Sequence, residues 1–405
     1  MQLQRCPKVS ADTGIRTMMP SETLKRVLPL MPAAGLEPLE DITPRDNIGI
    51  PVFSVARPKT AHGKTKFYNG KGPTPEQAKA SAVMEAIERY SAELRDTDEI
   101  VYGTFDEAMK TGLTLDPAEM ILPHRTMNYY KNDVIAWCRA YELFRGEEIW
   151  VPACAVYHPY TAEGDLQLIR FHTNGIAAGN TMEEAILHGM LELIERDAWS
   201  ICEYREKANA DVILEEGSLC SELMKKFNDN GVEIYLKDLT SDIGIPTIGA
   251  AADDVSTKDP ELLNIGVGTH LNPEIAAIRA LTEVAQSRTT HKHGSKINVK
   301  MQRISQELGY ENVKRANRVW YSKSSRTVRL SDMKRLDTQY VLDDIEVVFD
   351  RLIQCNFDKV IVADITRPEV GVPSVRMIIP GLEVSTMDPE REGPRLCGAW
   401  EKDQR

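Results

Sequence analysis

The sequence predicts an α/β (α+β) fold made of repeated units, each with a strand, a glycine-containing turn and a capped helix, arranged around one central site. Three observations predict it: a proline motif that recurs before strand-like runs, a capped helix start that follows three copies of the motif, and a second internal similarity. Strand-like and helix-like segments alternate along the chain, as expected where both elements pack around one core.

The proline motif is an aliphatic residue followed by proline. It precedes the runs VFSVA, ACAVY, TIGAA and SVRMII, at Ile50-Pro51, Val151-Pro152, Ile245-Pro246 and Val372-Pro373. Proline is acceptable at the start of a strand because no ladder N–H is needed there. We therefore expect a strand after each copy.

Glycines and then a helix start follow the first three runs. Thr74 with Gln77, and Thr181 with Glu184, have the spacing of a capping box, and Asn272 precedes a proline at a first helical position. Three helices are predicted to begin after these caps.

The second similarity joins residues 232–246, VEIYLKDLTSDIGIP, to residues 359–373, KVIVADITRPEVGVP. An amphipathic segment precedes each of them, at about 221–228 and 342–355. A helix followed by a strand is therefore expected twice more.

The three capped helices carry polar residues at matched positions. Counted from each cap, the seventh residue is Ser81, His188 or Arg279, and the eleventh and fourteenth give the pairs Glu85 and Glu88, Glu192 and Glu195, and Glu283 and Gln286. These three positions share one face of a helix. The pattern therefore predicts a common site where the three helices meet.

The carboxylates of the first two helices stand among apolar residues, so they are expected to be buried and to need cations. A single ExxER motif would be explained by an ion pair such as Glu85 with Arg89. Two copies in the same register, with ExxQxR in the third helix, favour Mg²⁺, which binds a few carboxylates together with substrate phosphates. Lys71, Arg196 and Arg288 are candidate phosphate contacts.

Composition excludes several other classes of protein. The formal net charge of −12 argues against non-specific binding to nucleic acid or to a membrane. No apolar run approaches the roughly 20 residues of a membrane span, and residues 1–8 lack an apolar signal core. A cytoplasmic location with reduced cysteines is therefore expected.

Four segments together resemble the YcaO family. They are GKGPTPEQAKASAVMEAIERYSAE, HTNGIAAGNTMEEAILHGMLELIERDAW, GVGTHLNPEIAAIRALTEVAQSR and VIVADITRPEVGVPSVRMIIPGLE. The matches run from about residue 47 to 385. The resemblance implies a YcaO fold and a YcaO domain at 46–385. Residues 1–45 are rich in proline and charge and are expected to form an N-terminal extension, and the charged, proline-containing C-terminal tail at 386–405 is expected to lie over the surface.

The resemblance also implies the ligands. In that family paired glutamates bind Mg²⁺ that holds the phosphates of ATP, which assigns the metal to Glu85, Glu88, Glu192 and Glu195. The remaining candidates for ATP binding are Lys71, Ser81, Asn174, Arg196, Glu283, Gln286 and Arg288. His188 is either a proton-transfer group or a core histidine, and no general base is assigned.

The implied reaction is ATP-dependent phosphorylation of a peptide amide oxygen. Ring-forming members often end in a proline-rich segment, whereas this chain ends GAWEKDQR. Its overall similarity to the YcaO proteins of methanogens implies sulfide attack and a thioamide, at a glycine of the methyl-coenzyme M reductase α subunit, commonly with a TfuA partner. A homodimer is expected. The alternatives are an azoline-forming cyclodehydratase of the same fold and a non-catalytic ATP-binding scaffold or regulatory protein.

Overall fold

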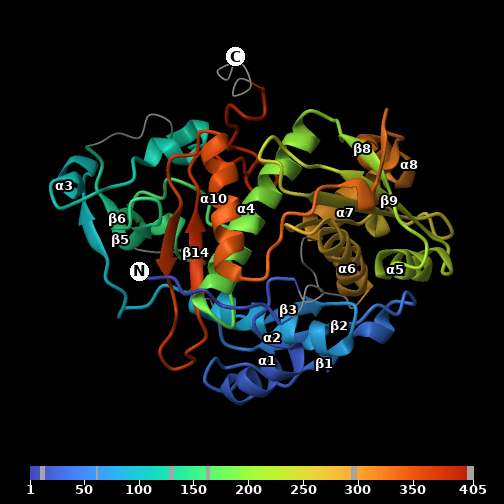
Figure 1. Cartoon of the computed structure of the whole chain (residues 1–405), viewed down its shortest axis with the longest axis horizontal. Coiled ribbons are helices and arrows are strands. Elements are labelled where there is room, and N and C mark those ends of the chain that lie inside the picture. Colours follow the sequence, from blue (N-terminus) through green and yellow to red (C-terminus); the bar gives the residue numbers. More distant parts are fainter. Residues whose placement is uncertain (10–13, 61–62, 127–131, 161–164, 293–298, 399–405) are drawn as a thin grey trace.

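The computed structural model of the chain describes residues 1–9, 14–60, 63–126, 132–160, 165–292 and 299–398 (Figure 1). Helices and strands are mixed throughout, so the predicted fold class is confirmed. The helices are α1 (Pro20–Val27), α2 (Pro75–Ser91), α3 (Phe105–Met109), α4 (Met182–Tyr204), α5 (Leu219–Asn228), α6 (Pro273–Lys292), α7 (Val299–Leu308), α8 (Tyr310–Ala316), α9 (Arg318–Tyr321) and α10 (Val341–Gln354).

The strands form three sheets. The first has the order β1 (Glu40–Asp41), β2 (Val52–Arg57), β3 (Lys66–Lys71). The second has the order β11 (Ile265–Thr269), β10 (Thr247–Asp254), β9 (Val232–Asp238), β8 (Ala210–Ile213), β12 (Thr327–Arg329). The third has the order β4 (Val101–Gly103), β5 (Ile135–Glu142), β13 (Ile361–Asp364), β14 (Ser374–Ile378), β7 (Ile176–Ala178), and β6 (Glu147–Pro152) also pairs with β5.

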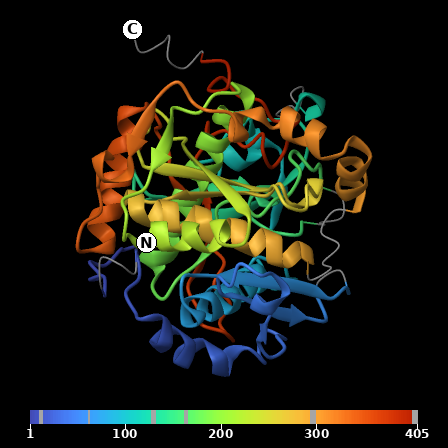
Figure 2. The same cartoon turned by 90° about the vertical axis from the view of Figure 1, so that its right-hand side faces the viewer.

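Each sheet packs against one of the three capped helices. Helix α2 lies on β2 and β3, α4 on β7 and β14, and α6 on β10 and β11. In Figure 2 the N-terminal part of the chain, in blue, forms one end of the molecule beneath α6. A capped helix therefore packs on strands in all three predicted units, and residues of the three helices line one central cavity.

The three caps form as predicted, with one difference. The Thr74 side chain accepts a hydrogen bond from the Gln77 backbone N–H, and the Thr181 side chain accepts one from that of Glu184. However, the Glu184 carboxylate accepts a bond from the Asn180 backbone N–H rather than from that of Thr181, so the second capping box is incomplete.

Three of the six glycines before these helices, Gly70, Gly266 and Gly268, lie in strands, whereas Gly175 lies in a turn. A Cβ atom on Gly70 would lie 2.0 Å from the backbone nitrogen of Ala82, and one on Gly268 would lie 2.2 Å from the carbonyl oxygen of Ala276. Glycine lets each strand approach the backbone of its helix directly. The glycines therefore hold strand and helix close together.

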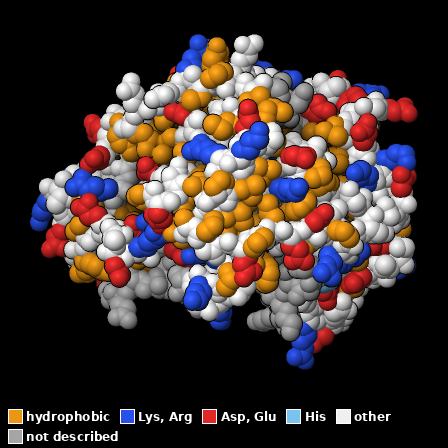
Figure 3. Space-filling model, turned by 90° about the horizontal axis from the view of Figure 1, so that it is seen from below, with side chains coloured by type: hydrophobic (Ala, Val, Ile, Leu, Met, Phe, Trp, Pro, Cys, Tyr) orange, Lys and Arg blue, Asp and Glu red, His pale blue; other side chains and the backbone are white. Residues whose placement is uncertain are grey.

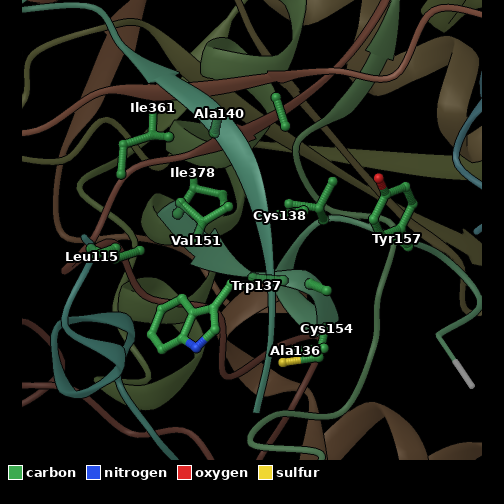
Figure 4. Close-up of a cluster of buried hydrophobic side chains, with 14 of the residues drawn as sticks. Leu115, Ala136, Trp137, Cys138, Ala140, Val151, Cys154, Tyr157, Ile361 and Ile378 are labelled. Carbon is green, nitrogen blue, oxygen red and sulfur yellow. The ribbon is translucent and has the colours of Figure 1, made fainter. Parts of the chain in front are cut away.

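One predicted strand is wrong. The run ACAVY after Pro152 begins a short 3₁₀ helix at Ala153–Ala155, and the strand β6 ends at the proline instead of beginning there. The core around this point contains Trp137, whose indole N–H donates to the Gly103 carbonyl at 3.0 Å, together with Val151 and Ile361 (Figure 4). A short apolar run in such a core can belong to either element.

Segments near both ends of the sequence are fastened to α4. The Gln4 backbone N–H donates to Glu183 at 2.6 Å near the start of the helix. Towards its other end, Asp197 accepts bonds from the Glu383 backbone N–H at 2.9 Å and from the Arg395 guanidinium at 2.8 Å. Arg395 is only 2% exposed, so the described part of the predicted tail is anchored in the protein at this residue, while Glu390 and Glu392 are exposed.

Basic and acidic side chains are mixed with apolar ones across the face shown in Figure 3. Within the described residues, no helix is long and apolar enough to cross a membrane.

Candidate functional site

A cavity of about 280 Å³ lies where α2, α4 and α6 meet. Nine of the eleven predicted site residues line it: Lys71, Ser81, Glu85, Glu88, Glu192, Glu195, Arg196, Glu283 and Gln286. The matched positions counted from the three helix caps therefore converge on one space.

The first pair of glutamates comes from α2. Glu88 is buried, and its carboxylate contacts the Arg89 guanidinium at 2.9 Å and accepts a hydrogen bond from the Ala178 backbone N–H at 3.2 Å. Glu85 stands one turn earlier, 3.8 Å from Arg89. Arg89 thus partly neutralises both carboxylates.

The second pair comes from α4. Glu195 is buried, lies 3.5 Å from Arg196 and accepts a hydrogen bond from the Thr269 backbone N–H at 3.0 Å. Glu192 has neither a hydrogen bond nor an ion pair within the described part of the chain. A partly buried carboxylate without a partner is destabilising unless a cation is supplied from elsewhere.

The pKa values of the glutamates in the cavity are raised, as expected where buried carboxylates lack enough positive charge nearby. Burial, only partly offset by Arg89, and the neighbouring Glu192 and Glu85 carboxylates raise the pKa of Glu88 to about 8. Burial likewise raises the pKa of Glu195 to about 7, and burial raises the pKa of Glu85. Several buried carboxylates that resist ionisation together are typical of a functional site.

The third helix supplies a different arrangement. The Lys71 ammonium contacts Glu283 at 2.6 Å, and the Gln286 side chain donates to the Asn69 backbone carbonyl. Burial acts to raise the pKa of Glu283, but Lys71 and Arg196 outweigh it and the pKa is lowered. Glu283 therefore forms an ion pair with Lys71 at the edge of the cavity, and its pKa is lowered where those of Glu85, Glu88 and Glu195 are raised.

The residues present fit Mg²⁺. Among the described residues no three His, Cys, Asp or Glu side chains are already grouped as a metal site. Mg²⁺ does not require such a cage, because it usually keeps several waters and takes one or two carboxylates together with phosphate oxygens. Paired carboxylates with raised pKa values and an unpartnered Glu192 form a suitable donor set.

A second cavity, of about 210 Å³, is continuous with the first through six shared lining residues: Arg16, Lys71, Ser81, Met84, His188 and Arg279. Its other lining residues include Leu191, Ile275 and Ile278, so it is more apolar. His188 stands between the two cavities. Burial and the nearby Arg279 lower its pKa well below the usual value, which keeps the imidazole neutral.

Sequence reasoning missed part of this lining. Arg279 lines the cavity but was not among the predicted ATP-binding residues. It occupies the seventh position from its helix cap, as Ser81 and His188 do, and this shared position could have identified it. Arg16 comes from the N-terminal extension, lies 3.6 Å from Glu184 and had no sequence signal.

Two predicted ATP-binding residues are not brought to the cavity beside the glutamates. Arg288 is fully buried and forms ion pairs with Asp46 at 3.0 Å and Asp254 at 3.1 Å. Asn174 is buried and lines a separate small cavity beneath β14. Arg288 therefore stabilises the fold through buried ion pairs, and Asn174 lies in a different cavity from the glutamates.

A carboxylate-lined cavity with cations at its edge and an apolar extension is typical of enzymes that bind a nucleoside triphosphate with Mg²⁺. A family model described as YcaO cyclodehydratase, ATP- and Mg²⁺-binding, matches residues 69–383. The chain belongs to the YcaO family, the family of enzymes that activate peptide backbones with ATP. That description names ATP and Mg²⁺, which confirms the prediction of these two cofactors.

Individual relatives agree with this family. A protein of Methanothermobacter thermautotrophicus is 46% identical over 384 residues, covering 94% of this chain and 98% of the relative. A protein of Rhizobium leguminosarum bv. trifolii, described by its position in the tfuA 3′ region, is 28% identical and covers 94% of this chain and 92% of its own length. The structure of YcaO from Methanopyrus kandleri, bound with AMPPCP and Mg²⁺, has a TM-score of 0.79 and 30% identity, and it covers 96% of this chain and 98% of that chain.

Proposed function

We propose that this chain uses ATP and Mg²⁺ to phosphorylate the oxygen of a peptide backbone amide, and that sulfide then replaces this oxygen to give a thioamide. The proposed substrate is a glycine in the methyl-coenzyme M reductase α subunit. The observation that carries the proposal is the convergence of two glutamate pairs from α2 and α4 on one cavity with Lys71 and Arg196 at its edge.

We assign Mg²⁺ to Glu85, Glu88, Glu192 and Glu195. When bound, Mg²⁺ neutralises the triphosphate and so favours transfer of its terminal phosphoryl group. Glu88 and Glu195 are fixed by backbone N–H groups, so they present their carboxylates in a set orientation.

Other residues of the chain bind and orient ATP. Lys71 is tied to Glu283, and we propose that it moves to a phosphate oxygen when ATP enters. Arg196, Ser81 and Gln286 line the same space and supply donors to the phosphates and ribose. The apolar cavity beside Met84 and Ile278 is the proposed place of the adenine base.

The sources of the relatives support sulfide as the nucleophile. Two of them come from methanogens, and a third is described by its position beside tfuA. On this basis we propose a TfuA-like partner and a separate source of sulfide. We further propose a homodimer in solution, which light scattering would test.

Azoline formation is the second candidate, because the matching family model is described as a cyclodehydratase. In that reaction a neighbouring Cys, Ser or Thr side chain attacks the activated amide. The product has lost one water, whereas thioamidation exchanges oxygen for sulfur.

The test is mass spectrometry of a glycine-containing reductase peptide after incubation with the protein, ATP, Mg²⁺ and sulfide, with and without a TfuA partner. Exchange of oxygen for sulfur is expected, and Glu85→Gln should abolish it. Glu76→Gln is the matched control, because Glu76 lies on the same helix but is exposed. A product that has lost water would favour azoline formation, and ATP consumption without a changed peptide would count against both reactions. ATP binding with neither ATP consumption nor a changed peptide would favour a non-catalytic scaffold or regulatory protein.

A further inference from the structure

The small cavity beneath β14 has a volume of about 50 Å³ and is lined by His172, Asn174, Arg376 and Arg391, together with residues 377–384. It is much smaller than the cavity beside the glutamates, so it has room for a small ion or a few waters but not for a nucleotide.

This cavity and the glutamate site lie on neighbouring faces of α4. Leu193 lines the small cavity, and the preceding residue, Glu192, lines the glutamate site. The charge of Glu192 also acts on Arg376, so the two spaces are electrostatically coupled.

Two buried arginines meet a single histidine here. Arg376 is 4% exposed, donates to the His172 backbone carbonyl at 2.8 Å and lies 3.4 Å from its Nδ1 atom. Arg391 is 6% exposed, lies 3.0 Å from the other ring nitrogen of His172 and donates to the backbone carbonyls of Met120 and Ile121. The Nε atom of Arg376 is buried and has no hydrogen-bond partner within the described part of the chain.

The two arginines are not held in direct ion pairs, although the charge of Glu192 acts on Arg376 and the charges of Asp388 and Glu383 act on Arg391. Neither forms an ion pair with a carboxylate of the described residues. Glu383 lines the cavity, but its carboxylate accepts hydrogen bonds from the backbone N–H groups of Gly393 and Arg395. Asp388 is 1% exposed, and its charge acts on Arg391. One of its carboxylate oxygens accepts a hydrogen bond from the Glu390 backbone N–H at 3.4 Å, and the other has no hydrogen-bond partner within the described residues.

The pKa values agree with the burial of two positive charges close together. Burial lowers the pKa of Arg376 to about 9 and that of Arg391 to about 10. Burial and both arginines lower the pKa of His172 well below its usual value, so the imidazole is neutral. Buried cations of this kind are stabilised when an anion binds beside them.

Asn174 provides an independent sign of a ligand. Its side chain is 2% exposed, and its amide oxygen has no hydrogen-bond partner within the described residues. A buried amide without a partner is rare in folded proteins and is usually satisfied by a bound molecule. The O and N atoms of an amide exchange places by a simple rotation, so Asn174 can turn its N–H groups to an anion.

We propose that this cavity binds a small monovalent anion, and that the anion is hydrosulfide, the nucleophile of the reaction. The assignment of hydrosulfide rests on the proposed function. Arg376 and Asn174 are the proposed binding residues, and Arg391 orients His172 behind them.

The chemistry balances without a redox partner. Transfer of the terminal phosphoryl group of ATP to the amide oxygen gives ADP and an O-phosphorylated imidate that keeps the amide proton on nitrogen. Hydrosulfide adds to the imidate carbon and forms a C–S bond. The C–O bond then breaks, phosphate leaves with the proton of the S–H group, and the carbon–sulfur double bond of the thioamide remains.

The first test is structural and uses bromide as a stand-in for hydrosulfide. Crystals of the full chain soaked in sodium bromide should show an anomalous scattering peak in contact with Arg376 and Asn174. The peak should be absent in Asn174→Asp, because the new carboxylate takes the place of the anion. That variant should be at least as stable as the native protein in thermal unfolding, since its carboxylate lies in a cavity with two arginines.

The second test is kinetic. In the thioamidation assay, Asn174→Asp and Arg376→Lys should raise the KM for sulfide about tenfold or more, because a charged hydrogen bond to the anion is lost or opposed. The KM for ATP should change by less than about twofold. Arg367→Lys is the matched control: Arg367 is equally buried, but it is ion-paired with Asp98 at 2.6 Å, so its loss should leave the KM for sulfide unchanged.

The outcomes separate this inference from the proposed function. No bromide in the cavity while thioamide still forms would overturn the anion site alone. Bromide in the cavity with an unchanged KM for sulfide would overturn the assignment of hydrosulfide. A product that has lost water would overturn the thioamidation itself and hydrosulfide with it.

Discussion

Replacing Glu88 by glutamine should make the metal-free protein more stable at alkaline pH and unable to gain stability from ATP and Mg²⁺. The glutamine keeps an oxygen to accept the bond from the Ala178 backbone N–H, so the shape of the site is preserved. What the substitution removes is a buried negative charge beside other carboxylates.

The magnitude follows from the pKa of Glu88, which is raised from 4.5 to about 8. Since the folded-state pKa is the higher one, ionisation of Glu88 lowers stability progressively between pH 4.5 and about 8, and the full penalty applies above that range. At about 1.4 kcal/mol per pH unit, the ceiling is about 5 kcal/mol. The ion pair with Arg89 is lost in the variant, so we expect a net gain of about 2–4 kcal/mol at pH 8.

The assay is thermal unfolding in the presence of a chelator at pH 5 and at pH 8. The variant should unfold about 2–5 °C above the native protein at pH 8, with a much smaller difference at pH 5. Addition of ATP and Mg²⁺ should raise the unfolding temperature of the native protein only. A variant that is no more stable than the native protein at pH 8, or that differs from it equally at both pH values, would refute the electrostatic reasoning. Glu76→Gln, at an exposed site of α2, should show no such pH dependence.

Two further predictions concern the frame of the site. Gly70→Ala should lower the affinity for ATP at least tenfold in calorimetry, because its Cβ would lie 2.0 Å from the backbone nitrogen of Ala82 and push α2 away from β3. Gly112→Ala is the control and should bind ATP normally, because its Cβ would meet nothing nearer than 3.9 Å. Arg395→Met should lower the free energy of unfolding by about 3–5 kcal/mol in urea denaturation, because it leaves the buried Asp197 without its cation, and a loss below about 1 kcal/mol would contradict that account.

The helices and their shared face could be predicted because the information is local. A cap and its partner are separated by three residues, and positions seven, eleven and fourteen of a helix are fixed relative to one another by its pitch. The position of Arg288 outside the cavity could also have been predicted from the sequence. Arg288 follows Gln286 by two residues, which turns it about 200° around α6 and away from the cavity.

Other features depend on partners that are distant in the sequence. The charged residues near position 390 have the composition of an exposed tail, yet Arg395 is paired with a carboxylate 198 residues away. Arg16 reaches the cavity from a segment with no helical or strand pattern. The apolar run after Pro152 shows neither period clearly, so its conformation is decided by the surrounding core.

The fastening of α4 at both ends has a consequence for how the protein is made. Its first turn is held by residues near position 4 and its later turns by residues 383–396, which the ribosome adds almost 200 residues after the helix itself. During synthesis the helix that carries Glu192 and Glu195 therefore lacks its final support until most of the chain has emerged. We therefore expect a chain that ends before residue 383 to bind ATP more weakly than the full chain.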